Sequence, residues 1–157
     1  MSRRKTIVKP KVITDAKFSN VAVAKLINYL MLDGKKYIAE TIVYKAITML
    51  GIELKQDPIK CFEKAVDTVK PLVEVRSRRV GGSTYQIPIE VRPTRQLFKS
   101  LKWIILAARS RVSDQGMSTK LCAELCDAYY ARGVAFKRKE DAHKMAEANK
   151  AFSHFRY

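Results

Sequence analysis

The residues capable of acid–base or phosphate chemistry stand apart from one another along the chain. His143 and His154 are the two histidines, and neither belongs to a His-Glu-x-x-His pattern. Gly34-Lys35 would end a phosphate-binding loop of the Walker type only if glycine also stood five residues earlier, where the sequence has Tyr29. We therefore expect no catalytic centre and no cofactor.

The three cysteines could also bind a metal. Cys122 and Cys126 are four apart and would share one helix face, which is half of a zinc site, but no second pair completes it. We expect both to be small core residues, Cys61 to lie at the core edge, and no metal to bind. An odd cysteine count without a secretory signal favours a reducing compartment.

The chemistry that the composition does favour is ionic. There are 31 Lys and Arg against 15 Asp and Glu, a net charge of +16, and such a chain is best neutralised by a polyanion. Residues 1–11 hold cations and no acid, whereas 12–69 are nearly balanced. Nucleic acid is thus the leading partner. No apolar run of about 18 residues is present, so we expect no membrane contact.

One strand-turn-strand pattern lies at about 72–92, between stretches that are helical in period. Apolar and polar residues alternate on both sides of Gly81-Gly82-Ser83-Thr84. Glycine reaches positive φ without steric cost, so this segment is the expected turn. The pattern predicts a protruding β-hairpin.

The apolar residues of both arms are odd-numbered. If they share one face of the hairpin, the residue numbers of two residues that lie opposite each other should add up to an even number. We expect the register that sets Glu74 opposite Arg92 and Arg76 opposite Glu90, because it pairs opposite charges across the strands. The arginines near the tip, Arg76, Arg78 and Arg79, suit phosphate binding. A solvated surface hairpin is the equally open alternative.

The remaining chain has helical periodicity and predicts a mainly α fold: a six-helix, bundle-like domain with one two-stranded hairpin and a basic arm. The helices are expected over about 20–31, 35–50, 57–69, 93–111, 118–131 and 138–152. Ser19 is the predicted cap of the first helix, Gly51 the stop of the second and Gly133 the stop of the fifth. We expect a flexible arm over 1–17 and a single helical domain over 18–157.

Several cations lie where helix stability does not require them. Lys35 and Lys36 at a helix N-terminus oppose the helix dipole, which indicates an external anion, with two solvated lysines as the alternative. The fourth helix carries cations and no acid, a pattern typical of a helix that reads a groove or a backbone. Its Trp103 is expected to pack rather than stack on a base. The last helix has a thin apolar stripe, so we expect it to dock on RNA or protein.

Three runs resemble the bacterial form of the small-subunit ribosomal protein seven family: residues 73–92, 33–36 and 139–157, with the opening Ser-Arg-Arg matching as well. The resemblance covers essentially the whole chain. The differences lie at 112–117, in the cysteine-containing fifth helix and at Tyr157, which is often Trp in the family.

The resemblance implies a protein of the ribosome in the cytoplasm of a bacterium, or in an organelle of bacterial descent. It implies binding to the 3′ major domain of small-subunit rRNA, nucleation of head assembly, and a hairpin near exit-site tRNA, mRNA and small-subunit protein eleven. The rRNA contacts that it implies are Arg3, Arg4, Lys5, Lys35, Lys36, Arg76, Arg78, Arg79, Arg92, Arg95, Lys102, Arg109, Arg111, Lys137, Arg138, His143, Lys144 and Asn149. Toward tRNA and mRNA it implies Arg78, Arg79, Gly81, Gly82, Ser83, Tyr85, His154 and Arg156.

Two other functions stay open from the residues. A free regulator could read duplex DNA with the fourth helix. An enzyme acting on RNA would need a catalytic constellation around His143, which the sequence does not contain.

Overall fold

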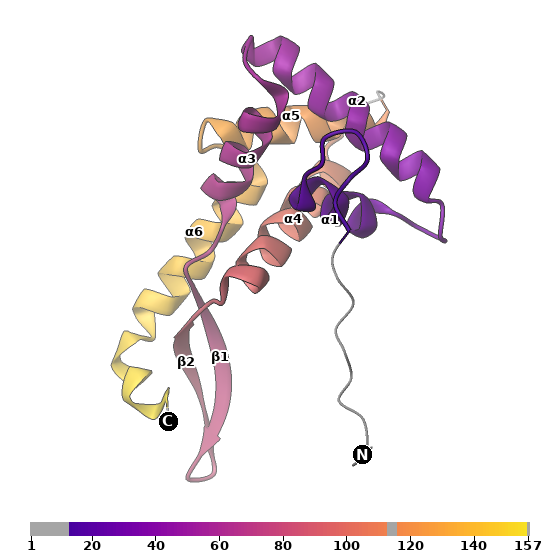
Figure 1. Ribbon diagram of the computed structural model, residues 1–157. Coiled ribbons are helices and arrows are strands. Elements are labelled where there is room, and N and C mark those ends of the chain that lie inside the picture. Colours follow the sequence, from indigo (N-terminus) through magenta and orange to yellow (C-terminus); the bar gives the residue numbers. More distant parts are fainter. Residues whose placement is uncertain (1–12, 113–115, 157) are drawn as a thin grey trace, which may run out of the picture.

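Six α-helices and one β-hairpin form the described part of this computed structural model, residues 13–112 and 116–156 (Figure 1). In chain order these are α1 Val21–Leu30, α2 Lys36–Leu54, α3 Pro58–Val69, β1 Val73–Val80, β2 Ser83–Glu90, α4 Pro93–Ser110, α5 Met117–Tyr129 and α6 Gly133–Ala148, followed by the 3₁₀ helix η1 Lys150–Arg156. The predicted mainly helical fold with one hairpin is confirmed. The predicted basic arm lies mostly outside the described residues.

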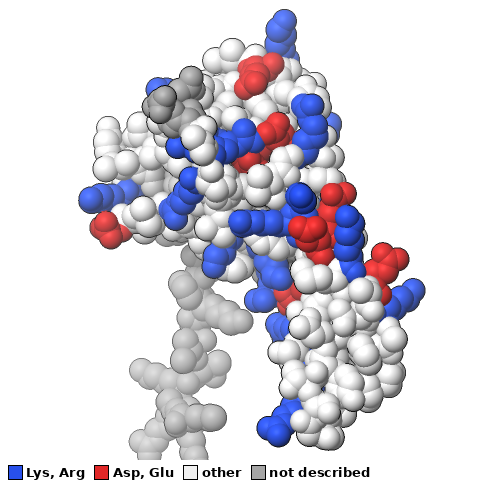
Figure 2. All heavy atoms as spheres, turned by 180° about the vertical axis from the view of Figure 1, so that it is seen from behind, with Lys and Arg blue, Asp and Glu red and all other residues white. Residues whose placement is uncertain are grey.

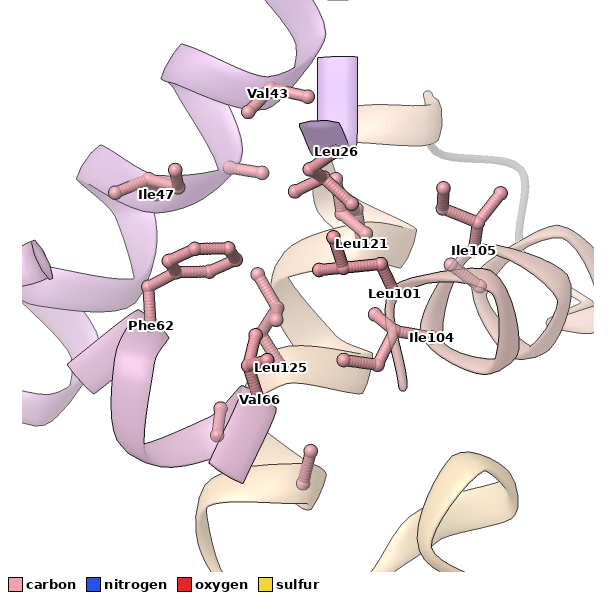
Figure 3. Close-up of a cluster of buried hydrophobic side chains, with 14 of the residues drawn as sticks. Leu26, Val43, Ile47, Phe62, Val66, Leu101, Ile104, Ile105, Leu121 and Leu125 are labelled. Carbon is pink, nitrogen blue, oxygen red and sulfur yellow. The ribbon is translucent and has the colours of Figure 1, made fainter. Parts of the chain in front are cut away.

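The hydrophobic core lies where α1 to α5 converge. Leu26, Phe62, Leu101 and Leu125 come from four different helices, are fully buried, and point toward one another (Figure 3). Helix α5 packs against α2, α3, α4 and α6, so it is the central element. Each such side chain contributes about 1.5–3 kcal/mol when it leaves water, and this core positions the surface residues discussed below.

The hairpin turn contains two residues instead of the predicted four. Gly81 and Gly82 have φ of 57° and 88°, and Val80 lies directly opposite Ser83. Two successive residues at positive φ form the tight turn whose twist matches that of antiparallel strands. This turn fixes the register of the whole hairpin.

The predicted register is wrong. Neither Glu74 and Arg92 nor Arg76 and Glu90 lie opposite each other, because the two-residue turn makes every pair of partners sum to an odd number. Even-numbered residues of β1 therefore share a face with odd-numbered residues of β2. The face turned toward the helices holds the buried Ile87 together with the charged Glu74.

The first helix begins with a different cap from the one predicted. The side chain of Asn20 accepts a hydrogen bond from the N–H of Ala22 at 2.7 Å, whereas Ser19 has a φ of 50° and lies outside the helix. Asparagine and serine are equally good N-caps, so composition alone could not choose between them.

Helix α2 does not stop at Gly51, as predicted, but continues to Leu54. Gly51 is buried, and a Cβ there would lie 2.5 Å from Cγ of Pro58 at the start of α3. The glycine thus permits the close approach of the two helices rather than ending one of them.

The last helix begins five residues before the predicted start and ends earlier. α6 starts at Gly133, where the buried carboxylate of Glu124 accepts the N–H of Ala135 at 3.0 Å. It ends at Ala148, and η1 turns back along β2 (Figure 1). Among the described residues, no helix has the length and apolar character needed to cross a lipid bilayer.

Candidate nucleic-acid interface

A buried carboxylate anchors the base of the hairpin to α4. Glu74 is 4% exposed and receives hydrogen bonds from Nε of Arg95, 3.0 Å from each carboxylate oxygen. Lys99 and Arg76 complete a ring of cations around it. Burial acts to raise the pKa of Glu74, but the hydrogen bonds from Lys99 and Arg95 outweigh it, so this pKa lies below its usual range. These cations therefore hold the hairpin in position.

The two arginines at the end of α4 also have partners inside the fold. Arg109 donates from Nη2 to the carbonyl of Leu30 at 3.1 Å, which ties α4 to α1. Arg111 bridges the carboxylates of Glu124 and Asp127 on α5. Partial burial lowers the pKa of Arg111, yet the hydrogen bonds to Asp127 and Glu124 raise it overall. Both side chains fix the orientation of α4.

Two polar residues of α6 and its end form internal hydrogen bonds. His143 accepts the N–H of Leu72 through Nε2 at 3.1 Å, so this nitrogen carries no proton. Burial first, and the nearby Lys139 second, lower the pKa of His143. Asn149 donates from Nδ2 to the carbonyl of Met145 at 2.7 Å. In the chain alone, both residues stabilise the C-terminal segment.

The C-terminal segment covers one face of the hairpin toward its tip. The Tyr85 ring packs against Phe152 and Phe155, with centroids 5.3 Å and 5.2 Å away. Arg78 donates from Nη1 to the carbonyl of Phe155 at 3.1 Å, and His154 packs its ring on Phe155. Phe152 of the predicted apolar stripe thus packs on the hairpin, whereas Met145 of the same stripe is 54% exposed. Docking of this segment on RNA or on another protein stays a prediction.

In a second group of predicted contacts, the charged side chain makes no hydrogen bond or ion pair within the part of the chain that the structure describes: Lys35, Arg79, Arg92, Lys137, Arg138 and Lys144. Lys36 pairs with Glu40 at 3.6 Å, but its side chain is 64% exposed, so the pair is weak. Figure 2 shows Lys and Arg over much of the back of the molecule and at the tip of the lower lobe, where the hairpin and C-terminal segment lie. Among the predicted contacts, these unpartnered cations are the ones available to phosphate.

A hollow between α1 and α4 combines rings with cations. It has a volume of about 320 Å³, and Tyr29, Phe98, Lys102 and Arg109 line it. The Tyr29 and Phe98 rings meet edge to face, with centroids 5.2 Å apart. Aromatic rings beside cations can receive an unstacked base and its phosphate. Sequence reasoning missed both rings, although the four-residue spacing of Phe98 and Lys102 on one helix was visible.

Some predicted contacts lie outside the described residues, namely Arg3, Arg4 and Lys5 of the arm and the side chain of Arg156. Gly81, Gly82 and Ser83 are exposed at the hairpin tip, as a contact site requires. The predicted site residues thus form an unpartnered group and a group with partners in the fold.

Comparison with known proteins gives one consistent family. The sequence model described as "Ribosomal protein S7p/S5e" matches residues 2–150. The "Small ribosomal subunit protein uS7" of Roseobacter denitrificans is 52% identical over 157 residues, which is all of both chains. The proteins of that name from Borrelia duttonii and Ruegeria pomeroyi are also 52% identical over the full length of both chains.

Proposed function

This chain belongs to the ribosomal protein S7p/S5e family, and we infer from that membership that it is a structural, RNA-binding component of the small ribosomal subunit, active in translation and not an enzyme. The similar proteins named above come from bacteria, and by that similarity we infer that this chain works in the bacterial cytoplasm, on the ribosome.

More specifically, the proposal is that the chain binds the 3′ major domain of small-subunit rRNA, nucleates assembly of the subunit head, and sets the hairpin tip beside exit-site tRNA, mRNA and small-subunit protein eleven. The observation that carries this proposal is the group of unpartnered cations, which extends from the helical body to the hairpin tip. Large folded RNAs are recognised through shape and phosphate, and separated cations can reach several RNA helices at once.

The proposed roles follow from the partners of each side chain. Lys35, Lys36, Arg79, Arg92, Lys102, Lys137, Arg138 and Lys144 bind rRNA phosphate directly, joined by Arg3, Arg4 and Lys5. Tyr29 and Phe98 stack on a base. The remaining predicted rRNA contacts act mainly by holding this surface in shape: Arg76, Arg95, Arg109, Arg111, His143 and Asn149. The tip beside tRNA and mRNA is formed by Gly81, Gly82, Ser83 and Tyr85, together with Arg78, His154 and Arg156.

Charge-matched variants test this division. Replacing Arg79, Arg92 and Lys102 by Gln removes three charges from the proposed interface. Affinity for a 3′ major domain transcript should fall, and the slope of log affinity against log salt should flatten by about two units, because each phosphate contact releases counterions. The control replaces Lys45, Lys55 and Lys60 by Gln, the same charge change on exposed lysines of α2, its C-cap and α3.

Equal losses in the two triple variants would contradict the proposal, since they would show that binding depends on net charge alone. Duplex DNA that competed as well as the rRNA transcript would instead favour the alternative in which α4 reads DNA.

A further inference from the structure

Three side chains able to bind a metal ion meet where α2 packs on α5. Cys122 and Cys126 lie one turn apart on α5, and Glu53 comes from the last turn of α2. Their three ligand atoms all lie within 4.8 Å of one another. Oε2 of Glu53 lies 3.1 Å from Sγ of Cys126 and 3.6 Å from Sγ of Cys122.

The 3.6 Å separation of Glu53 and Cys122 suits a tetrahedral zinc ion, and the 3.1 Å separation of Glu53 and Cys126 has to lengthen by about 0.5 Å when the ion enters. With Zn–S of about 2.3 Å and Zn–O of about 2.0–2.2 Å, neighbouring ligand atoms around zinc lie about 3.6–3.8 Å apart. We propose that Glu53, Cys122 and Cys126 form a zinc site that clamps the end of α2 to α5. This proposal does not depend on the proposed RNA contacts.

The three residues differ in burial, which shows which side of the site faces solvent. Both cysteines are buried, at 2% and 8% exposure, whereas Glu53 is exposed. The carboxylate therefore lies on the solvent side, and the fourth position of the ion is open to a water molecule. A closed structural site would have four protein ligands, so this one exchanges metal more readily.

Zinc binding here exchanges protons for the ion. Both thiols donate to the same carboxylate oxygen of Glu53, so each sulfur starts the exchange with its proton in place. As the two Zn–S bonds form, both S–H bonds break and two protons pass to solvent. The carboxylate that accepted the thiol hydrogen bonds then turns its oxygen to the ion.

Cobalt is the probe that reports thiolate ligands directly. In the reduced full-length protein, Co²⁺ should produce sulfur-to-metal charge-transfer absorption at one equivalent, and Zn²⁺ should displace it. The variant with both Cys122→Ser and Cys126→Ser should lose this absorption. Glu53→Gln should weaken Zn²⁺ binding at least about tenfold. Even mutation of a residue that only supports a metal ligand lowers metal affinity by about that factor.

Cys61→Ser is the matched control, because Cys61 is also buried but lies outside the cluster. It should bind Co²⁺ and Zn²⁺ as the unchanged protein does. Absence of the charge-transfer absorption, or its equal loss in Cys61→Ser, would overturn the proposal. If the double serine variant fails to fold by circular dichroism, Glu53→Gln decides, since its exposed side chain can change without disturbing the core: an unchanged Zn²⁺ affinity would then refute the site.

Discussion

At the scale of single residues, Glu74 shows how one buried charge organises a basic surface. Its carboxylate is enclosed by Arg95, Lys99 and Arg76, so it joins β1 to the first turns of α4. An uncompensated charge at such a position is costly, and each partner is held in a defined place. The cations around Glu74 are therefore positioned before any RNA arrives.

Glu74→Gln should lower the free energy of unfolding by about 2 kcal/mol, because the donors of Arg95 and Lys99 lose a charged acceptor while both cations stay partly exposed. Urea unfolding measures this. Glu147→Gln, on the exposed side of α6, is the control and should change the free energy by less than about 0.5 kcal/mol. Equal stability of the two variants would mean that the cluster does not hold the hairpin.

His143 gives the structure a defined pH dependence. Because the pKa of His143 is lowered in the fold, its contribution to stability is fully present above about pH 6.5, the unfolded value, and is lost as pH falls through the lower folded value. Protonation of Nε2 also breaks the bond from the N–H of Leu72. The unfolding free energy should therefore decrease as the pH falls below about 6.5.

His143→Gln should remove this decrease, since the amide oxygen can still accept the hydrogen bond but does not titrate. His154→Gln, on the exposed η1, should retain it. A pH dependence that survives in His143→Gln would show that another group causes it.

The sequence identified the basic residues of the candidate site but not which of them have partners. The sequence does not distinguish Arg111 from Arg79. In the structure, however, Arg111 bridges two carboxylates of α5, whereas Arg79 makes no such contact within the described residues. Glu53 was missed for the same reason, since 69 residues separate it from Cys122. Such pairings depend on how distant helices pack, which single-sequence periodicity does not contain.

At the scale of elements, the hairpin illustrates which local signals are decisive. The strands, their approximate bounds and the glycine turn were all predictable from alternation and from Gly81-Gly82. The register was predicted wrongly, because we assumed that the inner face of the hairpin must be apolar. In the fold this face holds Glu74, whose charge is neutralised by Arg95 and Lys99 of another element. The two-residue Gly-Gly turn would have indicated the correct register.

Replacing both Gly81 and Gly82 by Val should disturb the tip and leave the helical body intact. Both positions have positive φ, which costs an L-residue roughly 1–2 kcal/mol, and more when it is β-branched. Far-UV circular dichroism should retain the helical signal while amide resonances of the hairpin shift. Gly116→Val, at an ordinary φ of −62°, is the control. Global unfolding of the double variant would show that the hairpin belongs to the core.

At the scale of the whole molecule, the helical body differs from the hairpin, which packs against α6 and η1, in what stabilises it (Figure 1). The apolar core lies in the body, and the hairpin is stabilised by ion pairs and by the Tyr85 ring contacts. The fold class could be predicted from the sequence, because apolar residues recur with the 3.6-residue period of an α-helix over most of the chain. The start of α6 did not, because Glu124 of another helix supplies its cap.

The most direct test of the account is binding of the whole protein to a transcript of the 3′ major domain across a salt series, with the 5′ domain as competitor. We predict tight binding that weakens steeply with salt and that the 5′ domain does not displace, since the arrangement of cations, and not their number, selects the RNA. Equal displacement by both domains would contradict this and would leave a polycation without specificity.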